Sequence, residues 1–423
     1  MRIEKYRAFL NALNYLESLS NLKEKDFFAG TKDPRPQFKR MQHLLKLGGN
    51  PDRNFKIIHV TGTSGKGTTA NNIYNILQEA GYKTGAYFSP HVSVPTEKIQ
   101  INNKFISIEE FIVLTNKIKP IIEKCYQTLD TPSHFEIWFL LALLYFKEQK
   151  CDYVVLEVGC GGRYDATNAV QKTLISVITN IGLDHIHILG NTYEKIAYEK
   201  AGIIRPRGKV FTATERAGAL KVIQAEADKQ RADLTILQNQ ENPNESLAQS
   251  IAEYLNIPET AINKGFKKAK LPARFEIMQK NPMIILDGAH NSDKINFLVN
   301  KLKAFKSEEK ITGKILALCA LTSQKDPKTV LAPLFKEVDK IYLTRFTTTF
   351  RKTTPPLEIK KACPKDKLAG LFLDPESALS VLLKDAKKND LIIITGSFFL
   401  CGDLRGYWQD EIKQLEKRTN FVR

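Results

Sequence analysis

The strongest constraint on the fold is the stretch 55–70, FKIIHVTGTSGKGTTA, because three kinds of local pattern follow one another in it. The apolar run 55–60 predicts a buried strand, a glycine-rich turn follows, and the residues after it repeat apolar side chains at helical spacing. Backbone N–H groups at such a turn and at the helix N-terminus face an anion, and Lys66 adds a positive charge. The stretch therefore predicts a phosphate-binding loop.

The glycines of this turn support that prediction. Gly62, Gly65 and Gly67 allow the backbone to approach phosphates without an intervening Cβ. The general pattern places Ser or Thr directly after Gly-Lys, whereas here Gly67 comes before Thr68. The alternative is an ordinary strand-to-helix turn. Because both a strand and a helix flank the loop, we expect it to bind phosphate.

Length and composition indicate a globular protein of more than one domain. The 423 residues exceed one typical core, and the contents of 43% hydrophobic and 26% charged residues are those of a soluble chain. No apolar run approaches the ~18 residues of a membrane span, and the N-terminus lacks the apolar segment of a signal peptide. Six cysteines without a Cys-x-x-Cys pair favour reduced thiols in a cytoplasm.

The chain is strongly basic, with a formal net charge of +17. Its lysines and arginines are spread along the sequence rather than gathered in a block, which favours small anionic substrates or a solvated basic surface. No zinc finger or aromatic-interleaved basic strand is present in the sequence. We therefore expect neither a nucleic-acid partner nor a membrane partner.

Strand and helix patterns alternate along the chain, which predicts an α/β fold. We predict a P-loop ATPase domain with a mostly parallel sheet over residues 1–273, and a smaller Rossmann-like α/β domain over 274–423. The boundary lies in the linker candidate 271–276, after which the alternation restarts. Further strands are expected at 83–88, 151–158, 174–180, 283–286, 314–321, 340–344, 371–373 and 391–395, with helices at 108–129 and 134–149.

Polar residues stand where predicted inner strands end. Glu157, Asp184 and His185 follow buried strands, and Ser89 follows the strand at 83–88. The carboxyl ends of parallel strands meet at the edge where ligands bind, so these residues and Lys66 are expected to share that edge. Magnesium beside phosphates takes one or two carboxylate or hydroxyl oxygens, which makes Glu157 and Ser89 candidate ligands. The alternatives are a salt-bridged or capping acid and, for His185, a core histidine.

Three further positions have both a structural and a functional interpretation. Lys200 would by default be a surface lysine on a helix. Asp287 and Asn291 end a strand and begin a helix, so either could be a helix cap. Arg274 could contact a phosphate or pair with Glu276. An arginine in the linker and a polar strand end suggest a site shared by two closing domains.

Taken in order, these motifs resemble the Mur-ligase-like ATP-dependent amide ligases, and within them folylpolyglutamate synthase/dihydrofolate synthase. The resemblance covers nearly the whole chain. Only some 60 residues precede the phosphate loop, too few for the UDP-sugar-binding domain of the peptidoglycan-building members, which favours the folate branch. The matching segments are TGTSGKGT (61–68), SPH (89–91), EKIQIN (97–102), FE (135–136), EVGCGGRYDATN (157–168), DH and LG at the two ends of 184–190, EKAGI (199–203), ARFE (273–276), DGAHN (287–291) and TGS (395–397).

The resemblance implies a role for each motif. Catalysis would involve Lys66, His185, Lys200 and His290. The nucleotide would contact Thr63, Ser64, Gly65, Lys66, Gly67, Thr68, Asn244, Arg274 and Asp287. One magnesium would bind Ser89 and Glu157, and a second would bind His185 and a carbamylated Lys200. The pterin side would be lined by Ser133, His134, Phe135, Glu136 and Arg163, and the incoming glutamate would lie near His290 and Ser397.

The function that the resemblance implies is ATP-dependent amide ligation in folate biosynthesis and one-carbon metabolism. L-glutamate would be added to dihydropteroate, to (tetrahydro)folate and folylpolyglutamates, or to both, through an acyl phosphate, giving ADP and phosphate. Cofactors would be ATP and Mg²⁺, and we expect a cytoplasmic monomer. Ser64 stands where the family usually has Asn, Ser292 follows His-Asn where Pro is usual, and Trp138-Phe139 replaces a smaller, hydroxyl-bearing stretch, so the preferred folate form stays open.

The sequence is also compatible with two other functions. The first is a Mur-type ligase that joins an amino acid to a cell-wall precursor, which the short N-terminal segment disfavours. The second is a basic P-loop ATPase that binds nucleic acid, which predicts salt-sensitive binding. That function leaves the motifs at 157–168 and 287–291 without a role.

Overall fold

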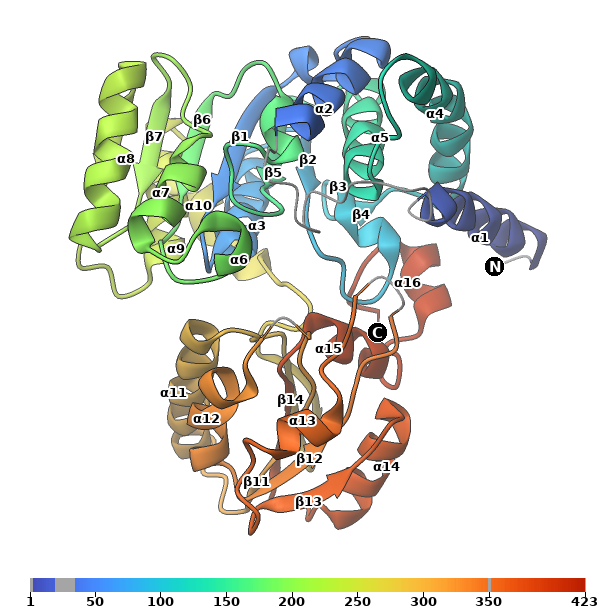
Figure 1. The fold of residues 1–423 in the computed structure, drawn as a ribbon, viewed down its shortest axis with the longest axis vertical. Coiled ribbons are helices and arrows are strands. Elements are labelled where there is room, and N and C mark those ends of the chain that lie inside the picture. The colour runs from blue at the N-terminus through green and yellow to red at the C-terminus, as the bar shows by residue number, and fades with distance from the viewer. Residues whose placement is uncertain (1–2, 20–34, 324, 349–350, 423) are drawn as a thin grey trace. The chain divides into compact units, whose positions relative to one another are not determined.

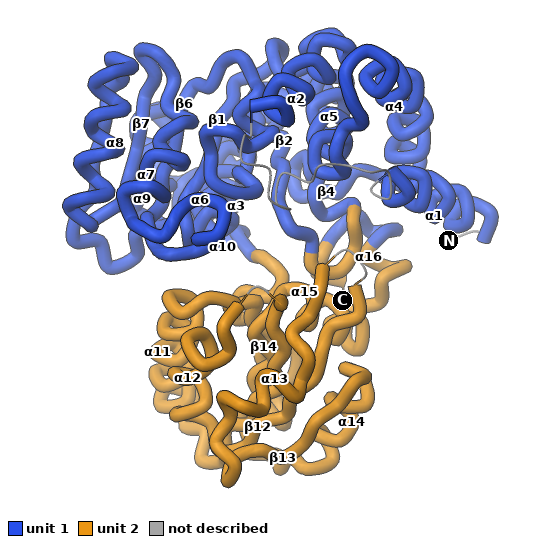
Figure 2. Tube along the Cα trace, in the orientation of Figure 1, with its two compact units in different colours: residues 1–91, 96–270, 415–419 blue, residues 92–95, 271–414, 420–423 orange. Residues whose placement is uncertain are grey.

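A computed structural model describes residues 3–19, 35–323, 325–348 and 351–422. The chain divides into two compact units (Figure 2). Unit 1 consists of Met1–His91, Thr96–Lys270 and Leu415–Thr419, and unit 2 consists of Val92–Pro95, Leu271–Gln414 and Asn420–Arg423. The chain therefore passes between the units at several points along its sequence, not only after residue 270.

Unit 1 is built on an eight-stranded sheet formed by described residues, in the order β4-β3-β2-β5-β1-β6-β7-β8 (Figure 1). The strands from β2 to β8 in this order pair in parallel, while β3 and β4 add antiparallel strands at one edge. The strands are β1 Lys56–Thr61, β2 Thr84–Tyr87, β3 Ile99–Ile101, β4 Lys104–Phe105, β5 Tyr153–Glu157, β6 Ile175–Ile178, β7 Lys209–Thr212 and β8 Asp233–Ile236.

Helices connect these strands and cover both faces of the sheet. The α-helices before the second unit are α1 Ile3–Ser18, α2 Arg35–Leu47, α3 Lys66–Glu79, α4 Ile108–Thr128, α5 His134–Glu148, α6 Ile186–Leu189, α7 Tyr193–Ala201, α8 Ala217–Gln230, α9 Pro243–Tyr254 and α10 Glu259–Lys268. Short 3-10 helices occur at η3 Pro51–Asn54, η4 Pro95–Lys98 and η5 Ala166–Ala169. Alternate residues of one strand enter different cores: Val177 packs with α3, α9 and α10, and its neighbour Ile178 packs with α7 and α8. This explains the continuous apolar runs of the inner strands.

The strand register aligns the carboxyl ends of the inner strands at one edge. Val60 pairs with Glu157, Thr61 pairs with Ile178, and Tyr87 pairs with Leu156. The loops that follow β1, β2, β5 and β6 therefore leave the sheet at the same edge. This is the arrangement expected from the sequence for Lys66, Ser89, Glu157 and the Asp184-His185 pair.

Unit 2 contains a second sheet, with the described strands in the order β13-β12-β11-β14-β10-β9. All neighbouring pairs are parallel except β9, which is antiparallel to β10. Helices α11 and α12 pack on one face of this sheet, and α14 and α15 pack on the other. The strands are β9 Glu276–Lys280, β10 Met283–Asp287, β11 Ile315–Cys319, β12 Lys340–Leu343, β13 Leu368–Leu371 and β14 Leu391–Thr395. The helices are α11 Ser292–Glu308, α12 Pro327–Glu337, α13 Pro356–Lys360, α14 Pro375–Asp385 and α15 Phe398–Arg405. The last helix, α16 Glu411–Lys417, begins in unit 2 and ends in unit 1.

The α/β fold class and its two mostly parallel sheets are confirmed. Two local predictions need correction. The strand expected at 371–373 lies at Leu368–Leu371, and the end of the linker candidate at Glu276 begins β9. Both are edge strands, which are less buried than inner strands and have a weaker apolar pattern.

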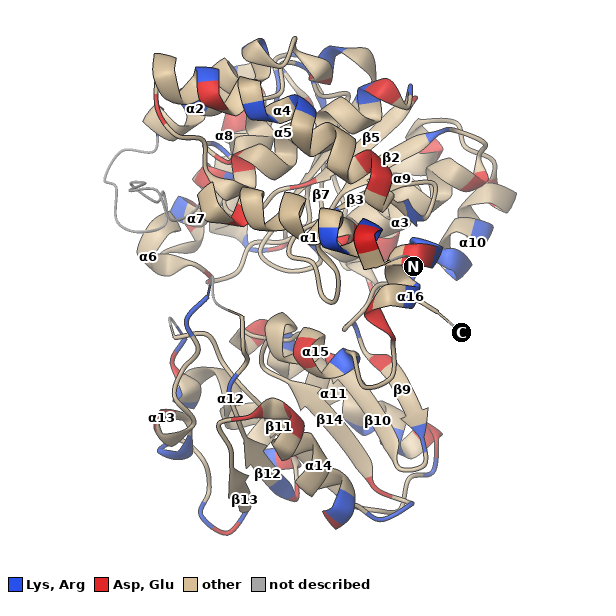
Figure 3. Ribbon diagram, turned by 90° about the vertical axis from the view of Figure 1, so that its right-hand side faces the viewer, with Lys and Arg blue, Asp and Glu red and all other residues tan. Residues whose placement is uncertain are grey.

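Charge and cysteine placement agree with the sequence patterns. Figure 3 shows Lys and Arg on many helices and loops of each unit rather than in one element. All six cysteines lie in described segments and are unpaired, and five of them are buried. Among the helices that the structure describes, none has the length and apolarity required to cross a bilayer.

Candidate active site

The phosphate loop, residues 62–68, joins β1 to α3, and its backbone needs glycine at two positions. Gly65 caps α3 with φ +81°, and a Cβ there would lie 2.0 Å from Asn244 Oδ1. A Cβ on Gly62 would lie 1.8 Å from Thr179 Oγ1. The first contact brings Asn244, at the start of α9, against the loop. Two predicted nucleotide-contacting positions that are far apart in sequence are therefore neighbours.

The loop is held by the segment that follows β6. Thr63 Oγ1 donates to Gly182 O at 3.0 Å and accepts from Gly182 N at 2.9 Å. Ser64 N donates to Asn180 Oδ1 at 2.7 Å, and Thr179 Oγ1 donates to Ser64 O at 2.5 Å. These bonds fix the loop without using the Ser64 hydroxyl. Ser64 Oγ is buried and has no hydrogen-bond partner among the described residues.

Two lysines donate to one backbone carbonyl of the loop. Lys66 Nζ lies 3.0 Å from Gly62 O, and Lys200 Nζ lies 2.9 Å from the same oxygen. The two nitrogens are therefore no more than about 6 Å apart. Lys200, predicted from its motif alone, is 3% exposed at the end of α7. Burial, and then the charge of Lys66, lower the pKa of Lys200 to about 7. Both effects favour the neutral amine over the ammonium at this position.

The two residues predicted to bind the first magnesium lie together. Ser89 N donates to Glu157 Oε2 at 3.2 Å, because β2 and β5 are neighbours in the sheet and both residues stand at or just beyond a strand end. Glu157 is 5% exposed. The backbone contact brings together two residues whose side-chain oxygens are the hard ligands that Mg²⁺ prefers.

His185 begins the short helix α6 and has φ +50°, an uncommon conformation for a residue other than glycine. Its N–H donates to Asp184 Oδ1 at 2.9 Å, and Asp184 is 7% exposed. The negative charge of Asp184 raises the pKa of Lys200, although burial and Lys66 outweigh it. Asp184 and Lys200 are thus electrostatic neighbours.

The donor set fits magnesium beside a phosphate better than a metal held by protein alone. The described residues contain no group of three or more His, Cys, Asp or Glu side chains arranged to bind a metal. Mg²⁺ usually keeps several waters and takes one or two protein carboxylates together with substrate phosphates. Glu157 and the hydroxyls of Ser89 and Ser64 offer the small number of protein oxygen ligands that such a magnesium ion takes.

Ser133 and Glu136, predicted to line the pterin side, form a capping box at the start of α5. Ser133 Oγ accepts from Glu136 N at 3.3 Å, and Ser133 N donates to Glu136 Oε2 at 2.8 Å. Glu136 also pairs with Arg40 of α2, whose Nε lies 2.8 Å from Oε2. Burial raises the pKa of Glu136 even though Arg40 opposes the shift. Both residues have structural roles here, and the spacing Ser-x-x-Glu was a sequence signal for the cap.

His134 and Phe135 occupy the first turn of the same helix. His134 Nε2 accepts from Trp138 Nε1 at 2.8 Å, and the Trp138 N–H can only donate, so this histidine nitrogen is unprotonated. Burial, and then the charge of Lys98, lower the pKa of His134 to about 3. The Phe135 ring packs edge-on against Tyr87 at 5.8 Å. The pair presents neutral aromatic groups rather than a charge.

Arg163 lies with the helix that carries Lys200. It pairs with Glu226 at 2.8 Å, donates to Tyr198 O at 3.0 Å, and stacks on the Tyr198 ring at 3.9 Å. These contacts, made among described residues, do not join it to the Ser133–Glu136 segment. Its predicted role on the pterin side therefore stays a prediction.

The motif 157–168 contains a buried hydrogen-bond network that the sequence analysis did not predict. Thr167 Oγ1 donates to Asp165 Oδ1 at 2.5 Å, and Asp165 Oδ2 accepts from Cys160 N at 2.9 Å. Because that hydroxyl is already a donor to Asp165, it accepts from His59 Nε2 at 2.8 Å. Burial lowers the pKa of His59 to about 3. Asp165 and Thr167 stand inside the motif 157–168, so the motif was the signal, whereas His59 looks like any strand residue.

In unit 2, Asp287 ends β10 and organises the turn before β9. It accepts from Phe275 N at 2.9 Å and from Ala289 N at 2.9 Å. Burial raises the pKa of Asp287, although the charge of Arg274 opposes this. The Arg274 guanidinium stacks on the Phe398 ring at 4.1 Å. The predicted nucleotide-contacting residues Asp287 and Arg274 are therefore electrostatic neighbours within one unit.

The other two predicted positions of unit 2 lie at the same edge of its sheet, because Asp287 pairs with Thr395 in register. His290 Nδ1 donates to Gly288 O at 2.7 Å, and His290 Nε2 lies 3.3 Å from Lys294 Nζ. Ser397 caps α15 by accepting from Phe399 N at 3.1 Å and is 2% exposed. Asn291, one of the alternatives left open, caps α11.

Comparison with known families defines the class. Residues 60–257 match the Mur ligase middle domain, and residues 270–407 match the C-terminal domain of dihydrofolate synthetase. A phosphate-loop α/β unit followed by a second α/β unit with these matches is the architecture of a Mur-type ligase, a class that forms carbon–nitrogen bonds.

Curated relatives narrow the class to one family. Dihydrofolate synthase/folylpolyglutamate synthase of Bacillus subtilis (strain 168) is 33% identical over 414 residues, covering 88% of this chain and 94% of the relative. The chain belongs to the dihydrofolate synthase/folylpolyglutamate synthase family.

Solved structures agree with this assignment. Escherichia coli FolC in complex with DHPP and ADP has a TM-score of 0.81 and 28% identity, covering 94% of this chain and 97% of that one. A bifunctional folylpolyglutamate synthase/dihydrofolate synthase with Mn, AMPPNP and L-glutamate bound has a TM-score of 0.77 and 29% identity, covering 88% and 94%.

Proposed function

We propose that this protein is an ATP-dependent ligase that adds L-glutamate to dihydropteroate, to reduced folates and their polyglutamates, or to both. The observation that carries the proposal is the pair Lys66 and Lys200 on the Gly62 carbonyl. A phosphate loop needs one lysine, and a second buried lysine beside it adds repulsion unless its charge is changed. The related structures with ADP and DHPP, and with AMPPNP and L-glutamate, support the substrate classes.

A carboxylate does not react with an amine at neutral pH, so the folate carboxylate must first take a phosphoryl group from ATP. The backbone of residues 62–68 and the Lys66 ammonium would hold the phosphates and neutralise the charge of the transfer. Ser89 and Glu157 would hold one Mg²⁺, which when bound supplies electrostatic stabilisation of phosphate charge. Manganese accompanies AMPPNP in one relative, and we propose magnesium as the physiological ion here.

Lys200 would act as a carbamate. The neutral amine adds to carbon dioxide, forming an N–C bond and releasing one proton, and the ammonium is replaced by an anionic oxygen donor. Its low pKa and burial support this chemistry, because the neutral amine is the reacting form. With His185, the carbamate would hold a second metal ion.

Thr68 is proposed to contact the nucleotide. Its side chain makes no hydrogen bond to described residues and is therefore available for this contact.

The unit 2 residues would contact the nucleotide and glutamate. Arg274 and Asp287 are proposed for ATP, and His290 and Ser397 for the incoming amino acid, whose amine attacks the acyl phosphate and displaces phosphate. On the pterin side we propose Phe135, His134 and Arg163, with Ser133 and Glu136 shaping that segment through the capping box. The functional division at residues 273 and 274, a cytoplasmic location and a monomeric state belong to the same proposal.

The test is ADP release with dihydropteroate, tetrahydrofolate or a cell-wall precursor as the acid, each with L-glutamate and other amino acids. The proposal expects turnover with L-glutamate and at least one of the two pterin acids, and none with the cell-wall precursor. Turnover confined to the cell-wall precursor would contradict it.

A further inference from the structure

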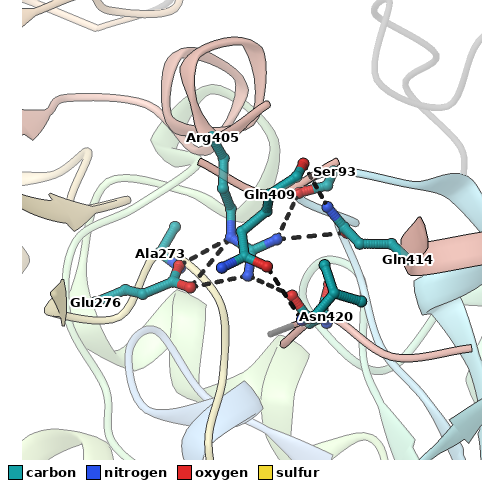
Figure 4. Close-up of polar contacts among 8 residues, drawn as sticks. Ser93, Ala273, Glu276, Arg405, Gln409, Gln414 and Asn420 are labelled. Carbon is teal, nitrogen blue, oxygen red and sulfur yellow. Dashed lines mark hydrogen bonds and ion pairs between the residues drawn. The ribbon is translucent and has the colours of Figure 1, made fainter. Parts of the chain in front are cut away.

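A single buried arginine gathers several separate segments of unit 2 (Figure 4). Arg405, the last residue of α15, is 0% exposed. Its guanidinium pairs with Glu276 at 2.8 Å, donates to Ser93 Oγ at 2.9 Å, and donates to Asn420 O at 2.7 Å. It also donates to Gln414 Oε1 at 3.4 Å.

Each of these partners stands near a point where the chain passes between the two units. Ser93 is within the short excursion 92–95, Gln414 precedes the passage at 414/415, and Asn420 follows the passage at 419/420. Glu276 is the sixth residue after the passage at 270/271. Within unit 2, one guanidinium therefore ties together every segment that enters or leaves the unit.

The Glu276 carboxylate, which pairs with Arg405, also holds the turn 273–275. Glu276 Oε2 accepts from Ala273 N at 2.8 Å. Ala273 has φ +50° and Phe275 has φ +49°, so two non-glycine residues in the left-handed region flank Arg274. Such conformations persist only where surrounding contacts impose them.

Helix α15 contacts this turn at both ends of its length. Its first residue, Phe398, carries the Arg274 guanidinium on its ring at 4.1 Å, and its last residue, Arg405, holds Glu276. The side chain of Arg274 and the backbone before β9 are therefore oriented by the same helix.

We propose that Arg405 is a positioning residue for ligation, which through Glu276 holds the left-handed turn 273–275 and thereby orients Arg274 toward ATP. The inference rests on the proposed contact of Arg274 with ATP. The geometry needs an arginine, because the fork donates to Glu276, Ser93 and Asn420 at once, whereas a lysine presents one nitrogen.

The test compares Arg405→Lys with the parent enzyme in full steady-state kinetics. We expect the KM for ATP to rise about tenfold to a hundredfold, as for a misplaced substrate contact, while the KM for folate changes less than about twofold. Glu276→Gln is the second variant, since the amide oxygen still accepts from Ala273 N but the ion pair is lost. It gives the same readout where Arg405→Lys fails to fold. The matched control is Arg345→Lys, which removes an exposed guanidinium from the same unit and leaves the KM for ATP unchanged.

Arg274→Ala separates the failure of this inference from the failure of the proposed function. If Arg274→Ala raises the KM for ATP, the double variant Arg274→Ala/Arg405→Lys should be no worse than Arg274→Ala alone, because both changes remove one contact. Additive effects, or an unchanged KM in Arg405→Lys and Glu276→Gln, overturn the positioning role alone. An unchanged KM in Arg274→Ala overturns both the ATP contact and the inference built on it.

Hydrogen exchange gives a readout that does not depend on activity. In Arg405→Lys, the amides of Ala273 and Phe275 should exchange faster, while the inner strand Met283–Asp287 keeps its protection. A uniform loss of protection across unit 2 would indicate a merely structural role and contradict the proposal.

Discussion

In the proposed function, two turns contact the nucleotide: the phosphate loop, residues 62–68, and the turn 273–275 before β9. Their backbone conformations are stabilised in opposite ways. The phosphate loop reaches the left-handed region at Gly65, where a side chain is absent and no strain arises. The turn before β9 reaches it at Ala273 and Phe275, where each residue costs roughly 1–2 kcal/mol. The first turn is specified by its own residues, whereas the second is imposed by Glu276, Asp287 and Arg405.

The two turns should therefore respond differently to substitution. Changes within the phosphate loop should act locally and strongly, because the loop itself supplies the phosphate contacts. The conformation of the second turn should instead be sensitive to changes in the residues that support it, including the distant Arg405.

Lys66→Ala should reduce ligation by roughly 10²–10³-fold or more, the loss seen when a preorganised electrostatic contact is removed. The side chain is half-buried and donates a hydrogen bond to Gly62 O within its own loop, so the fold should persist. Turnover at saturating ATP and thermal unfolding together provide the measurement. Lys221→Ala, at an exposed position of α8, is the control. Near-parental turnover of Lys66→Ala would end the phosphate-loop interpretation.

Lys200→Ala should be nearly inactive, with a loss on the order of 10²-fold, and should recover partly with acetate. Acetate supplies the carboxylate that the carbamate would provide, in a space left by the shortened side chain. Lys195→Ala, exposed on the same helix, should show neither effect. Full activity of Lys200→Ala in carbonate-depleted buffer would rule the carbamate out.

Glu157→Gln should shift the magnesium dependence by at least about tenfold, while the KM for folate stays near the parental value. Glutamine can still accept from Ser89 N, so the change removes charge more than structure. Titration of activity with MgCl₂ for parent and variant measures the shift. Superimposable titrations at equal rate would assign Glu157 a structural role.

Sequence patterns predicted those parts of the molecule whose cause is local. Apolar runs located β1, β5 and β6, and the aligned strand ends gave one edge with Ser89 beside Glu157. The motif that contains Lys200 also led to a residue beside Lys66.

What the sequence did not predict depends on partners far along the chain. Arg40 pairs with Glu136 over 96 positions, and Arg405 pairs with Glu276 over 129. Each ion pair satisfies a buried charge that only the assembled fold brings into contact. Ser133 and Glu136 were predicted to line a substrate site, and the structure adds a capping box that local spacing alone explains.

The smallest effect is expected for Ala273→Gly, paired with its opposite, Gly65→Ala. Glycine at 273 relieves left-handed strain of roughly 1–2 kcal/mol. It also removes a buried methyl group that stabilises the fold by about 0.8 kcal/mol. The greater entropy of the unfolded chain destabilises the fold by a further ~0.4–1 kcal/mol. The free energy of unfolding should therefore change by less than about 1 kcal/mol.

Gly65→Ala lowers the entropy of the unfolded chain, which stabilises the fold by about 0.4–1 kcal/mol, but its costs are larger. It introduces the same backbone strain and places a Cβ 2.0 Å from Asn244 Oδ1, so destabilisation of about 1–3 kcal/mol is expected. Urea unfolding of both variants measures the contrast. A loss above about 2 kcal/mol in Ala273→Gly would mean that the buried methyl, rather than Glu276 and Arg405, determines the conformation at 273, and the two turns would then differ less than their φ angles suggest.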